Sequence, residues 1–201
     1  MTRYIILEGP IGTGKSYLLS KLSKYYDKAT FIGEYIEEEA GKQEFAAFRE
    51  GRISTSDFQY YILDYWKRKL EFIEPGTYFL ERGPLAGLAF CDSSSMKNYY
   101  NFEKEILDFM KNINMAHFTV IRINSGKALS DYLNVIDTTP GNIVLFLERP
   151  AEECMNNIAK RGRYGEGTYT TEFIRSNSEK LYHLYTKYEV ELKIELNSLI
   201  N

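Results

Sequence analysis

The sequence predicts an α/β fold in which helices flank a parallel, five-stranded, doubly wound sheet. Three observations favour this fold class. Short apolar runs that suit strands buried on both faces alternate along the chain with amphipathic helical patterns. A glycine-rich turn joins the first apolar run to the first helical pattern. The length of 201 residues suits one domain with a single sizeable core, so residues 1–201 are taken as that domain.

Apolar runs bounded by turn signals predict the strands. The run at 118–123 alternates between apolar and polar residues and ends at a turn signal, whereas the segment that continues to 139 has no clear place in the pattern. The candidate strand segments are 3–8, 29–32, 77–80, 118–123, 143–147 and, last, 192–196.

Helical periodicity and capping signals predict the helices. The clearest start lies at 54–57, where three hydroxyl residues precede Asp57, and Pro75 with Gly76 ends the same helical pattern. Helices are expected from the glycine-rich turn to about residue 26 and over 36–50, 58–73, 84–90, 102–113, 151–160 and 171–189.

Charge and composition restrict the classes of partner. The formal net charge is −3, so no overall basic surface is expected to attract nucleic acid or an anionic membrane. No apolar run approaches the length of a membrane span, and the first strand begins too early to leave room for a signal peptide. Cys91 and Cys154 lack the spacing of a metal site and are expected to be buried thiols. A soluble intracellular protein is therefore expected.

The glycine-rich turn has the spacing G-x-x-x-x-G-K-S, which is the P-loop signature. Glycines let successive backbone N–H groups surround a polyphosphate, and the helix that follows adds the positive end of its dipole. Lys15 is expected to reach the outer phosphates of ATP, and the Ser16 hydroxyl to bind Mg²⁺. The predicted ATP-binding residues of the turn are Gly9, Pro10, Ile11, Gly12, Thr13, Gly14, Lys15 and Ser16.

Further charged groups follow the next two strands. Glu34 comes just after the second strand, and Glu81 with Arg82 after the third, so all three are expected at the edge of the sheet where ligands bind. The alternative for Glu34 is that one of the acids at 37–39 takes its place, or that all four form a solvated face.

Arginines follow the helix at 151–160. Arg161 and Arg163 flank a glycine, which suits a mobile lid that closes over phosphates, although a basic helix C-terminus has the same pattern. The Asp-x-x-Gly and Asn-Lys-x-Asp elements of GTPases do not occur in the sequence. A small phosphotransferase is therefore the better interpretation of the P-loop.

Taken in order, these motifs resemble the deoxynucleoside kinase family, which includes deoxycytidine, deoxyguanosine and mitochondrial-type thymidine kinases. The matching pieces are 8–16, Glu34, Phe58-Gln59, 79–82 and 161–166, and they span nearly the whole chain. The resemblance implies that 118–139 is a family-type insertion, that the protein is a homodimer, and that it uses Mg²⁺ with ATP.

The resemblance also implies catalytic roles. Glu34 matches the carboxylate that accepts the proton of the sugar 5′-hydroxyl, although the residue after it is Tyr35 where the family often has proline. Arg82 matches the arginine that holds this hydroxyl, and Glu81 matches a Mg²⁺ partner beside Ser16. Lys15, Arg161 and Arg163 match the cations that clamp the transferring phosphoryl group.

On the nucleoside side, Gln59 matches the amide that pairs with the base, and Glu166 the carboxylate that accepts a bond from the sugar 3′-hydroxyl. Phe48 lies near the place of a family tyrosine but can only pack. Phe90 is either a stacking face for the base or a core residue.

The choice of base rests on two positions of the resemblance. Where cytidine- and purine-preferring members carry Asp and Arg, this chain has Gly87 and Trp66. A small residue such as Gly87 leaves space for the thymine methyl, which favours thymidine or a broad range of pyrimidines. The lid lacks an arginine of the family, because Asn157 stands in its place.

The sequence thus predicts an ATP-dependent kinase that phosphorylates the 5′-hydroxyl of a deoxynucleoside for nucleotide salvage. One alternative is a nucleoside monophosphate kinase resembling thymidylate kinase. Glu34 argues against it, since a phosphate acceptor calls for an arginine near that strand end and the sequence has none there. The other alternative is a P-loop module that binds nucleotide without transferring phosphate.

Overall fold

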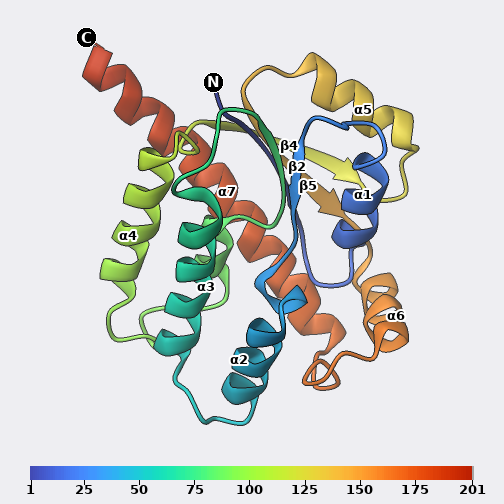
Figure 1. The fold of residues 1–201 in the computed structure, drawn as a ribbon. Coiled ribbons are helices and arrows are strands. Elements are labelled where there is room, and N and C mark those ends of the chain that lie inside the picture. Colours follow the sequence, from blue (N-terminus) through green and yellow to red (C-terminus); the bar gives the residue numbers. More distant parts are fainter. Residues whose placement is uncertain (201) are drawn as a thin grey trace.

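A computed structural model describes residues 1–200 and contains one five-stranded sheet whose strands are all parallel (Figure 1). The strand order across the sheet is β2-β3-β1-β5-β4. The predicted fold class is confirmed. The strands are β1 (Arg3–Glu8), β2 (Thr30–Ile32), β3 (Thr77–Glu81), β4 (Phe118–Asn124) and β5 (Asn142–Glu148).

Most helices lie where the sequence predicts them, but α5 was not predicted and α7 continues past its expected end at residue 189. The segments after β2 and β3 begin as short 3₁₀ turns, so the helix expected over 84–90 is of this tighter type. The helices are α1 (Lys15–Leu22), η1 (Tyr35–Glu37), α2 (Glu39–Arg49), α3 (Thr55–Leu70), η2 (Pro84–Ala89), α4 (Tyr99–Asn112), α5 (Leu129–Thr138), α6 (Ala151–Arg161) and α7 (Thr171–Ile200).

The helices cover both faces of the sheet. In β1, Tyr4 and Ile6 point into one core with side chains of α3, α4 and α7, whereas Ile5 and Leu7 point into a second core with α1 and α5. This division agrees with Figure 1, where α1 and α5 lie on one side of the strands and α3, α4 and α7 on the other. Burial on both faces explains why the strands are continuous apolar runs.

The predicted start of α3 is confirmed. The Ser54 hydroxyl accepts a hydrogen bond from Asp57 N at 3.0 Å, and the Asp57 carboxylate accepts one from Ser54 N at 3.0 Å. This reciprocal capping box satisfies two backbone donors that a helix start would otherwise leave unpaired. It fixes the beginning of the helix that carries Gln59.

The predicted last strand, 192–196, is wrong, because these residues continue α7. Tyr185, Tyr188 and Leu192 follow one another at helical spacing and are all buried in the core shared with α3 and α4. The Lys111 ammonium also binds the Glu195 carboxylate at 2.9 Å. An apolar stripe on a helix therefore outweighs the short alternation that suggested a strand.

The strand β4 forms one edge of the sheet and pairs with β5 along its full length. The segment 118–139, which had no clear role in the sequence, thus forms β4 and the helix α5 that covers the second core. Arg3 fastens the end of α5, because its guanidinium donates to the carbonyls of Ile136 at 2.8 Å and Thr139 at 2.6 Å.

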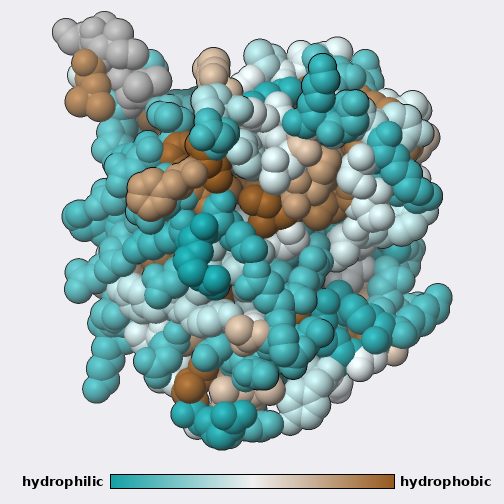
Figure 2. All heavy atoms as spheres, in the orientation of Figure 1, coloured by the Kyte–Doolittle hydropathy of each residue, from teal (hydrophilic) through white to brown (hydrophobic). Residues whose placement is uncertain are grey.

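Figure 2 shows that polar residues dominate the face of the molecule seen in Figure 1, with apolar residues gathered in a band across its upper half. Within the described part of the chain, no helix is both long and apolar enough to cross a membrane.

Candidate active site

A cavity of about 1060 Å³ lies at the carboxyl edge of the sheet and extends from the P-loop to the helices α2, α3 and α7. It brings together most of the residues that the sequence singles out. The predicted site residues that line it are Ile11, Gly12, Gly14, Lys15, Ser16, Glu34, Phe48, Gln59, Trp66, Glu81, Arg82, Gly87, Phe90, Arg161, Arg163 and Glu166. Gly9, Pro10 and Thr13 belong to the same turn but are buried and do not line the cavity.

The P-loop has the conformation that its glycines permit. Gly12 and Gly14 have φ angles of +84° and +98°, and a Cβ at Gly12 would come within 2.5 Å of the Cys154 carbonyl oxygen. Lys15 folds back over the turn, so its ammonium donates to the carbonyls of Gly9 at 3.2 Å and Pro10 at 2.9 Å. Burial and the neighbouring Arg82 lower the pKa of Lys15 to about 8.

Arg82 connects the P-loop to the end of β2. Its backbone has a φ of 65°, a conformation that non-glycine residues rarely adopt, and this turns the side chain back across the sheet edge. Nε donates to Glu34 Oε1 at 3.1 Å, and Nη1 donates to the Gly9 carbonyl at 3.0 Å. Burial lowers the pKa of Arg82, but Glu8 and Glu34 outweigh this effect and raise it.

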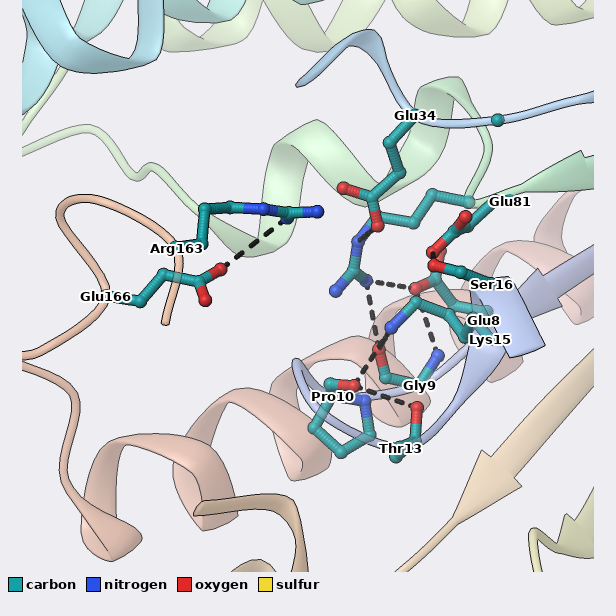
Figure 3. A network of polar contacts seen from close by, with 12 residues as sticks. Glu8, Gly9, Pro10, Thr13, Lys15, Ser16, Glu34, Glu81, Arg163 and Glu166 are labelled. Atoms are coloured by element: carbon teal, nitrogen blue, oxygen red, sulfur yellow. Dashed lines mark hydrogen bonds and ion pairs between the residues drawn. The ribbon is translucent and has the colours of Figure 1, made fainter. Parts of the chain in front are cut away.

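Glu34 faces the cavity among cations. Burial raises the pKa of its carboxyl, but Arg82, Lys15 and the two lid arginines outweigh burial, and the pKa lies below its ordinary value. Glu34 is therefore a carboxylate at neutral pH. In Figure 3 its side chain and that of Arg163 point toward one another from opposite sides of the site.

The three acids after Glu34 point elsewhere. Glu38 binds Lys69 at 2.6 Å and Glu39 binds Lys42 at 3.6 Å, both away from the P-loop. Glu37 is exposed and does not line the cavity. Of the four candidates, the structure brings only Glu34 to Arg82.

Ser16 and Glu81 meet beside the P-loop. The Ser16 hydroxyl donates to Glu81 Oε1 at 2.6 Å, while Glu81 Oε2 is buried without a hydrogen-bond partner. Burial and the nearby Glu34 raise the pKa of Glu81 to about 7. A hydroxyl and a carboxylate oxygen without a partner are hard ligands that suit Mg²⁺ when phosphates supply the remaining oxygens. No cluster of three or more metal-ligating side chains occurs among residues 1–200.

Glu81→Gln is expected to stabilise the metal-free protein at high pH. Because the pKa of Glu81 is raised from 4.5 to about 7 on folding, ionisation of this carboxyl lowers wild-type stability as pH rises through that interval. Glutamine cannot ionise, so its advantage should grow by about 2–3 kcal/mol between pH 5 and pH 8. Thermal unfolding of both proteins in EDTA at several pH values measures this difference in stability. A difference that does not change with pH would contradict the prediction.

In the lid, the two arginines that were expected to bind phosphate lie against Glu166, the glutamate that was expected to bind the sugar. Arg161 donates to the Glu166 carboxylate through Nε at 3.0 Å and Nη2 at 2.7 Å, and Arg163 lies 3.6 Å from it. Glu166 is buried under this pair. Asn157 does not reach toward the lid; its side-chain nitrogen donates to the Gly12 carbonyl at 2.8 Å.

Gln59 lies deep in the other half of the cavity. Its side chain is buried, and Oε1 has no hydrogen-bond partner. Such an orphaned acceptor costs free energy unless a ligand or water supplies a donor. Phe48 lies nearby on α2, stacked on Phe58 at 4.5 Å between ring centroids.

The remaining predicted residues on this side pack around Gln59 and Arg82. Phe90 lies under the Arg82 guanidinium at 5.3 Å, so its ring contacts a charged group of the site. Trp66 is almost fully buried against Tyr65 and belongs mainly to the core.

The structure adds cavity residues that the sequence analysis missed. Asn177 on α7 is buried, lines the cavity and leaves its Oδ1 without a partner. Arg49 and Tyr169 also line the cavity and stack at 5.6 Å. Asn177 lies in a long amphipathic helix with no motif around it, so only the fold brings it to the site. Glu8, which ends β1, belongs to the matching piece 8–16, but no role was predicted for it from the sequence.

Solved structures of one enzyme share this architecture. A structure of deoxyadenosine kinase from M. mycoides with the products dCMP and a flexible dCDP bound has 18% identity and a TM-score of 0.60, covering 98% of this chain and 97% of that one. The same enzyme with bound dATP has 18% identity and a TM-score of 0.56, covering 99% and 100%. With bound dCTP it has 16% identity and a TM-score of 0.62, covering 98% of both.

No protein-family model matches the chain, and no curated protein matches it in sequence. The likeness is therefore one of structure over the full length of both chains. This chain has the P-loop kinase fold of the deoxyadenosine kinase structures.

Proposed function

We propose that this protein is an ATP-dependent deoxynucleoside kinase, which phosphorylates the 5′-hydroxyl of a deoxynucleoside for nucleotide salvage. One observation carries the proposal. The Glu34–Arg82 pair, joined at 3.1 Å, lies beside the P-loop in the same cavity as the unpaired amide oxygen of Gln59. The cavity, about 1060 Å³, has room for a nucleoside and the phosphates of ATP.

In the proposed reaction, the P-loop backbone and Lys15 hold the phosphates of ATP. Ser16 and Glu81 would hold Mg²⁺, which would supply positive charge against these phosphates. Glu34 accepts the proton of the 5′-hydroxyl as the hydroxyl oxygen bonds to the γ-phosphorus of ATP and the bond from that phosphorus to the leaving ADP oxygen breaks. Arg82 orients this hydroxyl and stabilises the charge that develops on the transferring group. For the lid to close over the phosphates, Arg161 and Arg163 exchange Glu166 for phosphate oxygens, and Glu166 becomes free to bind the 3′-hydroxyl.

For the acceptor we propose thymidine or a broad range of pyrimidine deoxynucleosides. Gln59 supplies the amide for the edge of the base, and Phe48 with Phe58 supplies an aromatic wall. Gly87 borders the amide, because a Cβ added there would lie 3.3 Å from Gln59 Oε1. The structurally similar deoxyadenosine kinase has been solved with cytosine and adenine nucleotides, so a similar fold accommodates more than one base.

Gly87→Ala is expected to lower the kcat/KM for thymidine more than that for deoxycytidine. The added methyl group would meet Gln59 Oε1 at 3.3 Å and the Phe102 ring at 3.4 Å, so it would narrow the space next to the base. The ratio of the two kcat/KM values should fall about tenfold, within the 1–3 kcal/mol that one methyl group contributes. Steady-state kinetics with both nucleosides measure this ratio.

The control is Gly76→Ala, whose added methyl group meets only the Tyr78 ring at 3.7 Å, at the other end of β3. It should leave the ratio unchanged. A Gly87→Ala enzyme with the wild-type ratio would contradict the role of this position in base choice.

A nucleoside monophosphate kinase is the second candidate, and one observation favours it. Arg49, which follows β2 on α2, lines the cavity and offers a cation for an acceptor phosphate. Its guanidinium is engaged by Thr168 and Tyr169 of the lid, however, and Glu34 would repel an acceptor phosphate.

The deciding experiment gives the purified protein ATP and Mg²⁺ with each of the four deoxynucleosides, then with thymidine monophosphate, and measures ADP. We expect turnover with pyrimidine deoxynucleosides. Turnover only with the monophosphate would establish the second candidate. Nucleotide binding without any turnover would establish a non-catalytic P-loop module. We also propose a homodimer, on the family resemblance alone, and sedimentation equilibrium would test it.

A further inference from the structure

Glu8 is a fully buried carboxylate behind the site. It is the last residue of β1, and its side chain is 0% exposed. Oε1 accepts hydrogen bonds from Gly9 N at 3.0 Å and from Arg82 Nη1, and Oε2 accepts one from the Tyr185 hydroxyl at 2.9 Å. Figure 3 shows Glu8 next to Lys15 and Gly9, below Glu34. Removing a charge from water at such depth is costly unless its partners are fixed in place.

Glu8 determines which donors of Arg82 remain for Glu34. Glu8 and the Gly9 carbonyl hold Nη1, which fixes the plane of the guanidinium in an orientation in which Nε, but not Nη2, donates to Glu34. A guanidinium free of Glu8 would be able to turn and pair with both oxygens of Glu34, the geometry that arginine and carboxylates favour. In the structure, Glu34 Oε2 has no hydrogen bond from any of residues 1–200. A proton acceptor needs such an unoccupied oxygen.

Tyr185 fixes the orientation of Glu8 from α7. Its ring is fully buried, and burial together with Glu8 raises the pKa of the hydroxyl well above its ordinary value. The phenol therefore stays protonated and donates. The helix α7 is thus connected to the Arg82 guanidinium in two steps. Tyr185 donates a hydrogen bond to Glu8, and Glu8 forms an ion pair with Arg82.

We propose that Glu8 and Tyr185 are positioning residues for phosphoryl transfer, which hold the Arg82 guanidinium so that Glu34 Oε2 stays free to accept a proton. Neither residue lines the cavity. The inference rests on the proposed kinase function, and it assigns a role in turnover to the helix α7 as well as to the strand ends. Because a misplacement of about 1 Å costs up to about 10²-fold in rate, the effect should appear in kcat.

The test compares Tyr185→Phe with Tyr4→Phe. Tyr4 is an equally buried tyrosine on β1 whose hydroxyl donates to the Ile113 carbonyl at 3.0 Å, away from the cavity. Both variants lose one buried hydroxyl and its hydrogen bond, so both should show a similar decrease in Tm. We expect Tyr185→Phe to lower kcat about tenfold with both KM values within twofold of wild type, and Tyr4→Phe to keep the wild-type kcat. Glu8→Gln, where it folds, should lower kcat further.

The possible outcomes are distinct. A Tyr185→Phe enzyme with wild-type kcat and a lowered Tm would overturn the positioning role and leave the kinase function standing. A parallel loss of kcat in Tyr4→Phe would also overturn it, since general destabilisation would then explain both variants. Wild-type protein without turnover on any nucleoside would overturn the proposed function and this inference with it.

Discussion

Replacing Glu34 by glutamine is expected to lower kcat for deoxynucleoside phosphorylation by about 10²–10⁴-fold, the usual contribution of a general base. Glutamine has nearly the same shape and keeps an oxygen for Arg82 Nε, which lies 3.1 Å away. It cannot take up the proton of a hydroxyl. Nucleotide binding should stay close to wild type, because the P-loop is unchanged. Single-turnover kinetics for the chemical step and fluorescence titration with a nucleotide analogue for binding would separate the two effects.

Glu39→Gln is the matched control. Glu39 lies five residues further along, its side chain is 75% exposed, and it pairs with Lys42 on the surface. This variant removes the same charge from the same stretch of acids and should keep wild-type kcat. If Glu34→Gln retained wild-type turnover of deoxynucleosides, Glu34 would not be the base.

The sequence was sufficient for the local parts of this architecture. The P-loop, the carboxyl ends of β2 and β3 and the capping box of α3 each depend on a few neighbouring residues, so a local pattern predicts them. The charges that follow those strands meet at one edge because parallel strands all end there. Glu34, Glu81 and Arg82 were predicted in this way.

The error at 192–196 shows where a local pattern fails. The five residues 192–196 alternate between apolar and charged side chains, which fits a strand. Leu192 also fits the apolar stripe of the preceding helix, but five residues are too few to show that stripe. Only the longer sequence of Tyr185, Tyr188 and Leu192, buried at helical spacing against the core, decides for α7. The place of β4 at the edge of the sheet is likewise a property of strand pairing, which no local pattern contains.

The connections behind the site are also beyond local patterns. A glutamate at the end of a strand gives no sign that a tyrosine 177 residues later will donate to it. Asn177 has a buried unpaired oxygen that becomes visible only when α7 is packed against the cavity. Such contacts arise from the fold as a whole, so no local sequence pattern predicts them.

Arg82→Lys is expected to lower kcat by about 10²-fold or more, although the charge is retained. The guanidinium presents Nε to Glu34 and Nη1 to both Glu8 and the Gly9 carbonyl, at separations fixed by its planar shape. The single ammonium of lysine cannot donate to both Glu8 and Glu34 at these separations. Steady-state kinetics measure the loss, and Arg122→Lys is the control, since Arg122 pairs with Glu148 on the surface with 53% of its side chain exposed.

Stability measurements separate the shape of Arg82 from its charge. Arg82→Met would leave Glu8 and Glu34 without their cation, at a cost of about 3–5 kcal/mol for a broken buried pair, whereas Arg82→Lys should lose much less. Both variants keep a side chain on the backbone with φ of 65°, so both bear the same conformational strain. If lysine restored turnover to within threefold of wild type, charge alone would suffice, and the strained backbone that aims the guanidinium would have no catalytic purpose.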